Sequence, residues 1–182
     1  MDREKLQTLF AALETEKHIV PEDIPNLDLY MDQVITFFEN HLAHTKRRPE
    51  DKLITKTMIN NYTKNKLMMP AVKKKYTKDH LLLLALIYEL KQVTSLEDIR
   101  ILFSLIQNDN DTDALNEVYN AYLALQPLQK QAVETTLDAL EDEKKAASLN
   151  GDAAEQALTC LLLFEQSLTY KRLAEKLLDT LS

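Results

Sequence analysis

Apolar residues recur every three or four positions along most of this chain, which is the spacing of helices that bury one face. The first such stretch predicts a helix over residues 2–17, and Pro21 and Pro25 interrupt the pattern after it. Asn26 is a suitable N-cap for a second helix, which is predicted to end near residue 42. The apolar stripe of that second helix consists of Leu29, Tyr30, Val34, Phe37, Phe38 and Leu42.

A polar and basic stretch, residues 43–52, is predicted to be a loop that leads into a short helix. If Thr55 is the N-cap of this helix, Ile54 and Ile59 occupy the two positions of a hydrophobic staple. At 100° per residue, one face of the helix holds Met58, Ile59 and Tyr62. The opposite face holds Lys56, Thr57, Asn60, Thr63 and Lys64. We therefore expect the apolar face to anchor the helix and the cationic, amide-rich face to meet solvent.

The segment 67–72 is short, apolar and broken by Pro70, and Lys73-Lys74-Lys75-Tyr76 follows it. This is the one place where we predict strands, as a small β-ribbon. Thr77 is expected to cap a buried helix that runs to about residue 91. Ser95 with Asp98 three residues later is an acidic variant of the capping box and predicts a further helix through residue 105.

The second half of the chain is acidic and predicted to be helical over residues 112–125, 127–147 and 152–181. The last helix is read as carrying one long apolar stripe, made of Leu158, Leu161, Phe164, Leu168, Leu173, Leu177 and Leu181. With a single Gly and five Pro in 182 residues, the composition supports a mostly α-helical fold.

Positive charge is concentrated in one block, residues 44–78, which holds eleven Lys and Arg against two acids. The whole chain has a net charge of −7, so the block at +9 leaves −16 for the remainder. A basic surface on an otherwise acidic protein favours a polyanionic partner. The usual alternative for a run of lysines is a solvated charged face without a partner.

Several function classes have no support in the sequence. One Gly cannot build a phosphate-binding loop, no Ser or Cys lies in an activated-nucleophile pattern, and we expect no enzyme and no cofactor. His41 and His44 lie one helical turn apart, but they lack the further ligands that zinc needs, and we expect no metal. The single cysteine excludes an intrachain disulfide, and no signal peptide or membrane span is visible, so we expect a cytoplasmic protein.

Residues 53–103 resemble the DNA-binding module of MerR-type transcription regulators. Tyr62 falls on the conserved Tyr of that family's recognition helix, Leu67 and Met68 on its paired leucines, and Pro70 on its proline. Further on, Tyr76-Thr77 resembles the Tyr-Ser that closes the wing, and Ser95-Leu96-Glu97-Asp98-Ile99 resembles the start of the next helix. This resemblance implies a winged helix-turn-helix that binds duplex DNA, with dimerising helices after it.

The sequence departs from the MerR pattern at several points, one of which is a longer loop before the recognition helix. Asn60 stands where the family has Arg, and Lys66 stands where it has Gly. The wing is shorter and carries Lys73, Lys74 and Lys75. Over its whole length, including Ile24–Gln33 and Asn60-Asn61-Tyr62, the chain more closely resembles a family of small bacterial proteins described as a domain of unknown function.

The resulting domain prediction is an N-terminal helix and connection over 1–25, a MerR-like domain with a short wing over 26–107, and a C-terminal helical region over 108–182. We predict a bacterial DNA-binding transcription regulator in which lysines contact phosphates and Asn60 and Thr57 read bases. The predicted DNA-binding residues are Arg47, Arg48, Lys56, Thr57, Asn60, Asn61, Lys64, Lys66, Lys73, Lys74 and Lys75.

Two alternatives remain open for the basic block: a helical interaction module that docks an acidic protein, and binding of structured RNA. For the C-terminal helices, the prediction is a homodimer joined through their apolar stripe. Closure of a bundle within one chain is the alternative for the same stripe.

Overall fold

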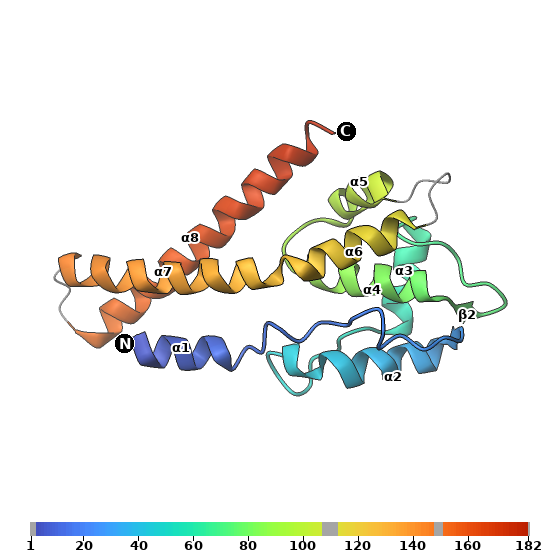
Figure 1. Cartoon of the computed structure of the whole chain (residues 1–182), viewed down its shortest axis with the longest axis horizontal. Coiled ribbons are helices and arrows are strands. Elements are labelled where there is room, and N and C mark those ends of the chain that lie inside the picture. Colours follow the sequence, from blue (N-terminus) through green and yellow to red (C-terminus); the bar gives the residue numbers. More distant parts are fainter. Residues whose placement is uncertain (1–2, 107–112, 148–150, 182) are drawn as a thin grey trace. The chain divides into compact units, whose positions relative to one another are not determined.

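The computed structural model of the chain describes residues 3–106, 113–147 and 151–181. It is mostly helical, with one small two-stranded sheet (Figure 1). The chain divides into two compact units. One consists mainly of Lys17–Ala124, and the other combines Met1–Glu16 with Leu125–Thr180. No helix among the described residues is both long enough and apolar enough to cross a bilayer.

The unit Lys17–Ala124 is built around a helix that is buried on almost every side. That helix, α4 (Lys78–Leu90), carries a run of leucines, Leu81 to Leu84, each at most 1% exposed. In Figure 1 the ribbon of α4 runs between those of α2 (Met31–Leu42) and α6 (Ala114–Ala124). A helix that is apolar all round belongs in the interior, so the helices around it contribute one face each.

The remaining elements of this unit are short. They are β1 (Leu29–Tyr30), the 3-10 turn η1 (Ala43–Thr45), α3 (Lys56–Lys64), β2 (Lys75–Tyr76) and α5 (Leu96–Ile106). Thr77 and Ser95 precede α4 and α5 as predicted, and the Ser95 hydroxyl accepts the backbone N–H of Asp98 at 3.1 Å.

The prediction that the second helix begins at Asn26 is wrong, because α2 begins at Met31. Leu29 and Tyr30 form β1 and pair in antiparallel register with Tyr76 and Lys75 of β2. The side chain of Gln33 accepts the backbone N–H of Tyr30 at 2.8 Å and stabilises the helix start there. Tyr30, predicted as part of the apolar stripe, is consequently exposed.

The predicted β-ribbon is present in reduced form. Within residues 67–76 the structure has only β2 and an isolated bridge between Val72 and Lys75, and the main partner of β2 is β1. The sheet therefore connects the segment before α2 with the segment before α4.

The core of the unit Lys17–Ala124 extends beyond the predicted limits of 26 and 107. Ile19 and Ile24 are buried in it, and α6 packs on α4 and α5. The hydroxyl of Tyr119 on α6 donates to the backbone carbonyl of Ile19 at 2.7 Å, and burial raises the pKa of that tyrosine. The predicted boundary itself, between 107 and 108, lies outside the described residues.

The second unit contains α1 (Arg3–Ala11), α7 (Gln126–Ala147) and α8 (Asp152–Leu178). The first helix thus ends well before residue 17, where its prediction had placed the end. α1 packs on α7 around a small core of Leu6, Leu137 and Leu140. An ion pair between Arg3 and Asp138, at 2.5 Å, adds to this contact.

The single apolar stripe predicted for the last helix is not present, because α8 is apolar on different sides along its length. At 100° per residue, Leu161, Phe164 and Leu168 lie on one face, whereas Leu173 and Leu177 lie on roughly the opposite face. Each of these five side chains is exposed.

Stability of the unit Lys17–Ala124 should depend on pH through His80, a buried residue at the start of α4. Its Nδ1 accepts the backbone N–H of Thr77 at 3.1 Å, a bond that requires an unprotonated Nδ1. Burial lowers the pKa of His80 below its ordinary 6.5, and the nearby carbonyls of Pro70 and Met69 oppose this shift only in part. Below pH 6.5 the unfolded chain therefore binds a proton that the folded chain resists.

We expect the free energy of unfolding to fall as the pH is lowered from 7.5 to 5.5, by up to about 1.4 kcal/mol per pH unit. His80→Gln, which keeps an acceptor at this capping position, should remove most of that fall in urea titrations. His44→Gln, at a partly exposed site, is the matched control and should leave the fall in place. An unchanged pH dependence in His80→Gln would contradict this assignment.

Candidate nucleic-acid interface

The helix α3 is fixed by local signals at its start, as predicted. The hydroxyl of Thr55 accepts the backbone N–H of Met58 at 3.2 Å, and the staple residues Ile54 and Ile59 are both buried. Ile59 and Tyr62 face the core, and burial raises the pKa of Tyr62. The solvent face of α3 carries no acid and consists of Lys56, Thr57, Asn60, Asn61, Lys64 and Asn65.

The end of α3 places a lysine where a glycine would be least strained. Leu67 donates its N–H to the carbonyl of Tyr62 at 3.0 Å, and Lys66 donates to that of Thr63 at 3.0 Å. This is the Schellman pattern of helix termination, which needs a left-handed residue after the C-cap. Lys66 takes that conformation with a φ of 58°. A lysine thus adopts a backbone geometry that glycine would adopt with less strain, and it adds a cation.

A tight turn after α3 contains two more lysines in the left-handed conformation. Val72 and Lys75 exchange two backbone hydrogen bonds of 3.0 Å across Lys73 and Lys74. The central residues have φ values of 51° and 65°, so both are left-handed, as in a two-residue hairpin turn. Asn-Gly is the favoured pair in such a turn, because Gly has no Cβ and Asn tolerates positive φ better than most residues, whereas the Cβ of other residues is unfavourable there. Two exposed lysines instead occupy the tip.

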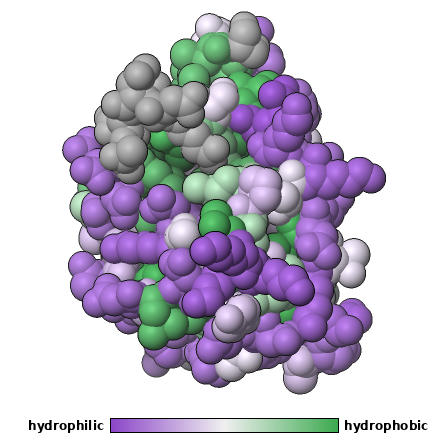
Figure 2. All heavy atoms as spheres, turned by 90° about the vertical axis from the view of Figure 1, so that its right-hand side faces the viewer, coloured by the Kyte–Doolittle hydropathy of each residue, from purple (hydrophilic) through white to green (hydrophobic). Residues whose placement is uncertain are grey.

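Two contacts bring the start of α3 and this turn to the same end of the unit. Lys56, the first residue of α3, pairs with Asp32 in the first turn of α2 at 2.7 Å. Lys75 lies with its ammonium 5.3 Å from the ring centroid of Tyr30, the residue before α2. Both lysines are therefore tied to the start of α2. Figure 2 shows the side of the molecule on which β2 lies, and its visible surface is mostly hydrophilic.

We use the term basic face for the predicted residues on the solvent side of α3, at its C-terminal end and in the turn Val72–Lys75. The basic face consists of Lys56, Thr57, Asn60, Asn61, Lys64, Lys66, Lys73, Lys74 and Lys75.

The two predicted arginines, Arg47 and Arg48, do not belong to the basic face. They lie exposed in the loop after α2, and Arg47 lines a cavity of about 660 Å³ with residues from the end of α4. The turn, by contrast, precedes the start of α4, which is 13 residues and thus about 20 Å long. The turn and Arg47 therefore lie near opposite ends of α4.

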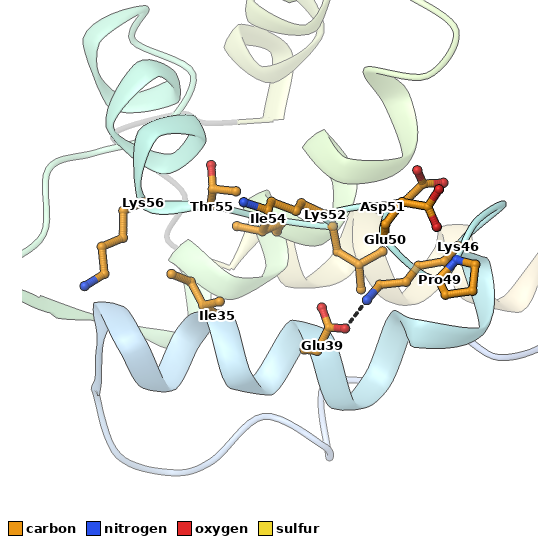
Figure 3. A pocket seen from close by; sticks show the side chains of 11 residues that line it. Ile35, Glu39, Lys46, Pro49, Glu50, Asp51, Lys52, Ile54, Thr55 and Lys56 are labelled. Carbon is orange, nitrogen blue, oxygen red and sulfur yellow. Dashed lines mark hydrogen bonds and ion pairs between the residues drawn. The ribbon is translucent and has the colours of Figure 1, made fainter.

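The loop between α2 and α3 borders a cleft of about 360 Å³, shown in Figure 3. Lys46 and Lys56 lie toward opposite ends of the residues drawn, and Lys46 forms an ion pair with Glu39 of α2. The cleft also contains Glu50 and Asp51, so its charges are mixed. Its evident role is structural, since the buried Leu53 and Ile54 in this loop hold the start of α3 in place.

The amide side chains of the basic face differ in their availability. The Asn65 amide donates to the side-chain oxygen of Asn61 at 3.0 Å and to its carbonyl at 2.8 Å, which occupies part of Asn61. Asn60 is exposed and makes no side-chain hydrogen bond to any described residue. It is the amide best placed to meet a ligand.

Two residues that shape this site were not predicted for it. Tyr30 was assigned to the apolar stripe of the second helix, and Asp32 was not singled out at all. The pairing of Tyr30 with a Gln three residues later, Gln33, is the capping signal that would have moved the helix start and exposed both residues.

The structure defines a class of mostly helical domain, in which a short cationic helix and a lysine-rich turn meet beside a two-stranded sheet. The family model described as Domain of unknown function (DUF1836) matches residues 19–122, and the chain belongs to this family. No curated protein and no solved structure matches the chain.

The lysines with positive φ should lower the stability of the fold, and replacement by glycine, which has no Cβ, should restore it. Lys66→Gly is expected to raise the free energy of unfolding by about 0.5–1 kcal/mol, because a Cβ is unfavourable at this φ. Lys64→Gly, two residues earlier in regular helix, is the matched control and should lower it by up to about 1 kcal/mol. Urea denaturation measures both, and a loss of stability in Lys66→Gly would contradict the strain argument.

Proposed function

We propose that this protein is a DNA-binding protein of the transcription-regulator class, and that the basic face is its duplex-binding surface. α3 would enter the major groove, and the turn Val72–Lys75 would act as a short wing on the adjacent backbone. The order β1, α2, α3, turn, β2 agrees with the winged helix-turn-helix that the MerR resemblance implies.

One observation carries this proposal: five lysines of the basic face have no ion-pair partner among the described residues. They are Lys64, Lys66, Lys73, Lys74 and Lys75. Three of them, Lys66, Lys73 and Lys74, are held in the left-handed conformation that costs a lysine energy. Unneutralised cations at strained positions are expected where a ligand, rather than folding, benefits from them.

Duplex DNA accounts for more of the face than an acidic protein does. Lysines contact phosphates without regard to sequence, whereas an amide can bond adenine bidentately in the major groove. Asn60 lies between Lys56 and Lys64 on the exposed side of α3, so one helix offers both kinds of contact. An acidic partner would use the lysines but would leave the central amide without a role.

The alternative of structured-RNA binding is less favoured, because the face lacks the exposed aromatic rings on which readers of unpaired bases stack them. Tyr62 and Tyr76 are buried beneath the face, and Tyr30 is the one exposed aromatic side chain beside it in the described part of the chain. A single ring does not form a stacking platform.

Binding to duplex DNA should weaken steeply with salt. With five lysines on phosphates, log K is expected to fall against log[salt] with a slope of about −4.5, at about 0.9 per contact. Lys66→Gly should bind more weakly and flatten the slope by about 0.9, although the same variant is expected to be more stable. Fluorescence anisotropy with pooled genomic fragments measures this. Salt-independent binding, or equal affinity for poly-glutamate at the same ionic strength, would contradict the proposal.

Two residues one turn apart on α3, Asn60 and Lys64, should have different roles, one in base reading and the other in phosphate contact. Asn60→Ala is expected to reduce discrimination at one or two base pairs by about 1–3 kcal/mol, whereas Lys64→Ala should weaken binding to every sequence alike. Both side chains are exposed, so neither change should alter the unfolding midpoint appreciably. Selected-sequence libraries bound by each variant provide the comparison. An unchanged sequence preference in Asn60→Ala would remove it from base reading.

A further inference from the structure

The cavity that Arg47 lines, near the end of α4, is large enough to hold a small organic ligand. Its volume is about 660 Å³, and its lining residues lie in the segments 45–47, 51–53 and 88–92 of the unit Lys17–Ala124. Small-molecule sites in proteins have volumes of roughly 300–1,000 Å³, whereas a water molecule takes up about 30 Å³. No residue of the basic face lines the cavity, so what the cavity binds is independent of what the basic face binds.

The charges that line the cavity favour an anion. Four cations and two carboxylates leave a net charge of +2. Both carboxylates are occupied by partners other than these cations. Glu89 accepts the Tyr122 hydroxyl and lies 3.3 Å from Nδ1 of His18. Asp51 accepts the backbone N–H of Arg48 at 2.9 Å.

Three of the four cations have no carboxylate partner in the described part of the chain. Lys46 is the exception, because it pairs with Glu39 of α2 (Figure 3). Arg47 and Lys52 are exposed loop residues, and Lys91 is the partly buried residue that follows α4. The cavity therefore has three cations available to a ligand.

Lys91 is the cation that gains most from an anion in the cavity. Its ammonium donates to the carbonyl of Leu53 at 3.3 Å and lies 5.2 Å from the centroid of the Tyr88 ring. Burial lowers the pKa of this lysine, which means that the surroundings disfavour its charge. The bond to Leu53 holds the loop before α3, but a neutral donor would make it without the cost of desolvating a charge. An anion beside Lys91 would offset that cost.

We propose that this cavity binds a small organic dianion, a phosphate monoester or a dicarboxylate, through Arg47, Lys52 and Lys91. A guanidinium binds two oxygens of a carboxylate or phosphate at once, and each ammonium adds a point charge. The two negative charges of such a ligand match the net charge of +2 on the lining.

The organic part of the ligand meets an apolar wall. Leu53 and Tyr88 are both buried and line the cavity. The Tyr88 hydroxyl lies 2.5 Å from Oγ1 of Thr45, which itself donates to the carbonyl of Leu42. Tyr88 must then donate to Thr45, so its ring rather than its hydroxyl is left for the ligand. An anion with an aromatic or aliphatic body should therefore bind more tightly than inorganic phosphate.

The first test follows the amide chemical shifts of the full-length protein during titration with phenyl phosphate and with succinate, at constant ionic strength. We expect saturable shifts in the segments 45–47, 51–53 and 88–92, and the dianion that binds more tightly distinguishes a phosphate monoester from a dicarboxylate. Phenol lacks the charge and should cause no such shifts, and inorganic phosphate should bind more weakly than the preferred dianion. No saturable shift with either dianion, shifts confined to the basic face, or equally tight binding of inorganic phosphate would overturn the proposal.

The second test compares two adjacent arginines. Arg47→Gln should raise the dissociation constant of the preferred dianion about tenfold or more, as expected for the loss of a charge-assisted hydrogen bond. Arg48→Gln removes the same charge from the next residue, which is exposed but does not line the cavity, and it should leave that constant unchanged.

Lys91→Met, which keeps the apolar stem of the side chain, should weaken binding as Arg47→Gln does. Circular dichroism verifies that all three variants remain folded. Equal weakening in Arg47→Gln and Arg48→Gln would assign the binding to the charge of the loop and overturn the proposal. Undiminished binding in folded Lys91→Met would overturn it as well.

Discussion

The pairing of β1 with β2 is the contact on which the arrangement of the basic face depends. It is only two residues long, but it joins the start of α2 to the turn that carries Lys73 and Lys74. Its strength comes from burial, since Leu29 and Tyr76 are both in the core and lie over the leucine-rich α4. An isolated pair of two-residue strands would not be stable in water. Because the core holds the turn in place, the turn keeps its conformation even with Lys73 and Lys74 at positions where a lysine is unfavourable.

Those disfavoured residues connect the fold with the proposed function. Among the described residues, four that are not glycine have positive φ, and three of the four are lysines of the basic face. Each position would be less strained with Gly. A sequence under pressure for stability alone would replace them. Their presence at the tips of exposed turns is explained if the cations contact a polyanion.

The sequence predicted the elements that short-range signals control. Thr55, Thr77 and Ser95 mark helix starts because a capping side chain acts on backbone groups within three residues of it. The strand β1 was missed because its partner lies 45 residues further on, and a two-residue strand has no period to detect. The separation of Arg47 and Arg48 from the basic face was also missed, since neighbours in sequence can lie at opposite ends of a 13-residue helix. The two faces of α8, by contrast, follow from 100° per residue and could have been predicted.

The most direct measurement of the central claim is a map of amide chemical shifts in the full-length protein on addition of a short duplex DNA at low salt. Binding through the basic face predicts shifts at residues 56–66 and 72–76, with Arg47, Arg48 and the helix α8 unaffected, and reversal on addition of salt. Shifts confined to the loop around Arg47 and Arg48, or an unchanged spectrum at saturating duplex, would contradict the account.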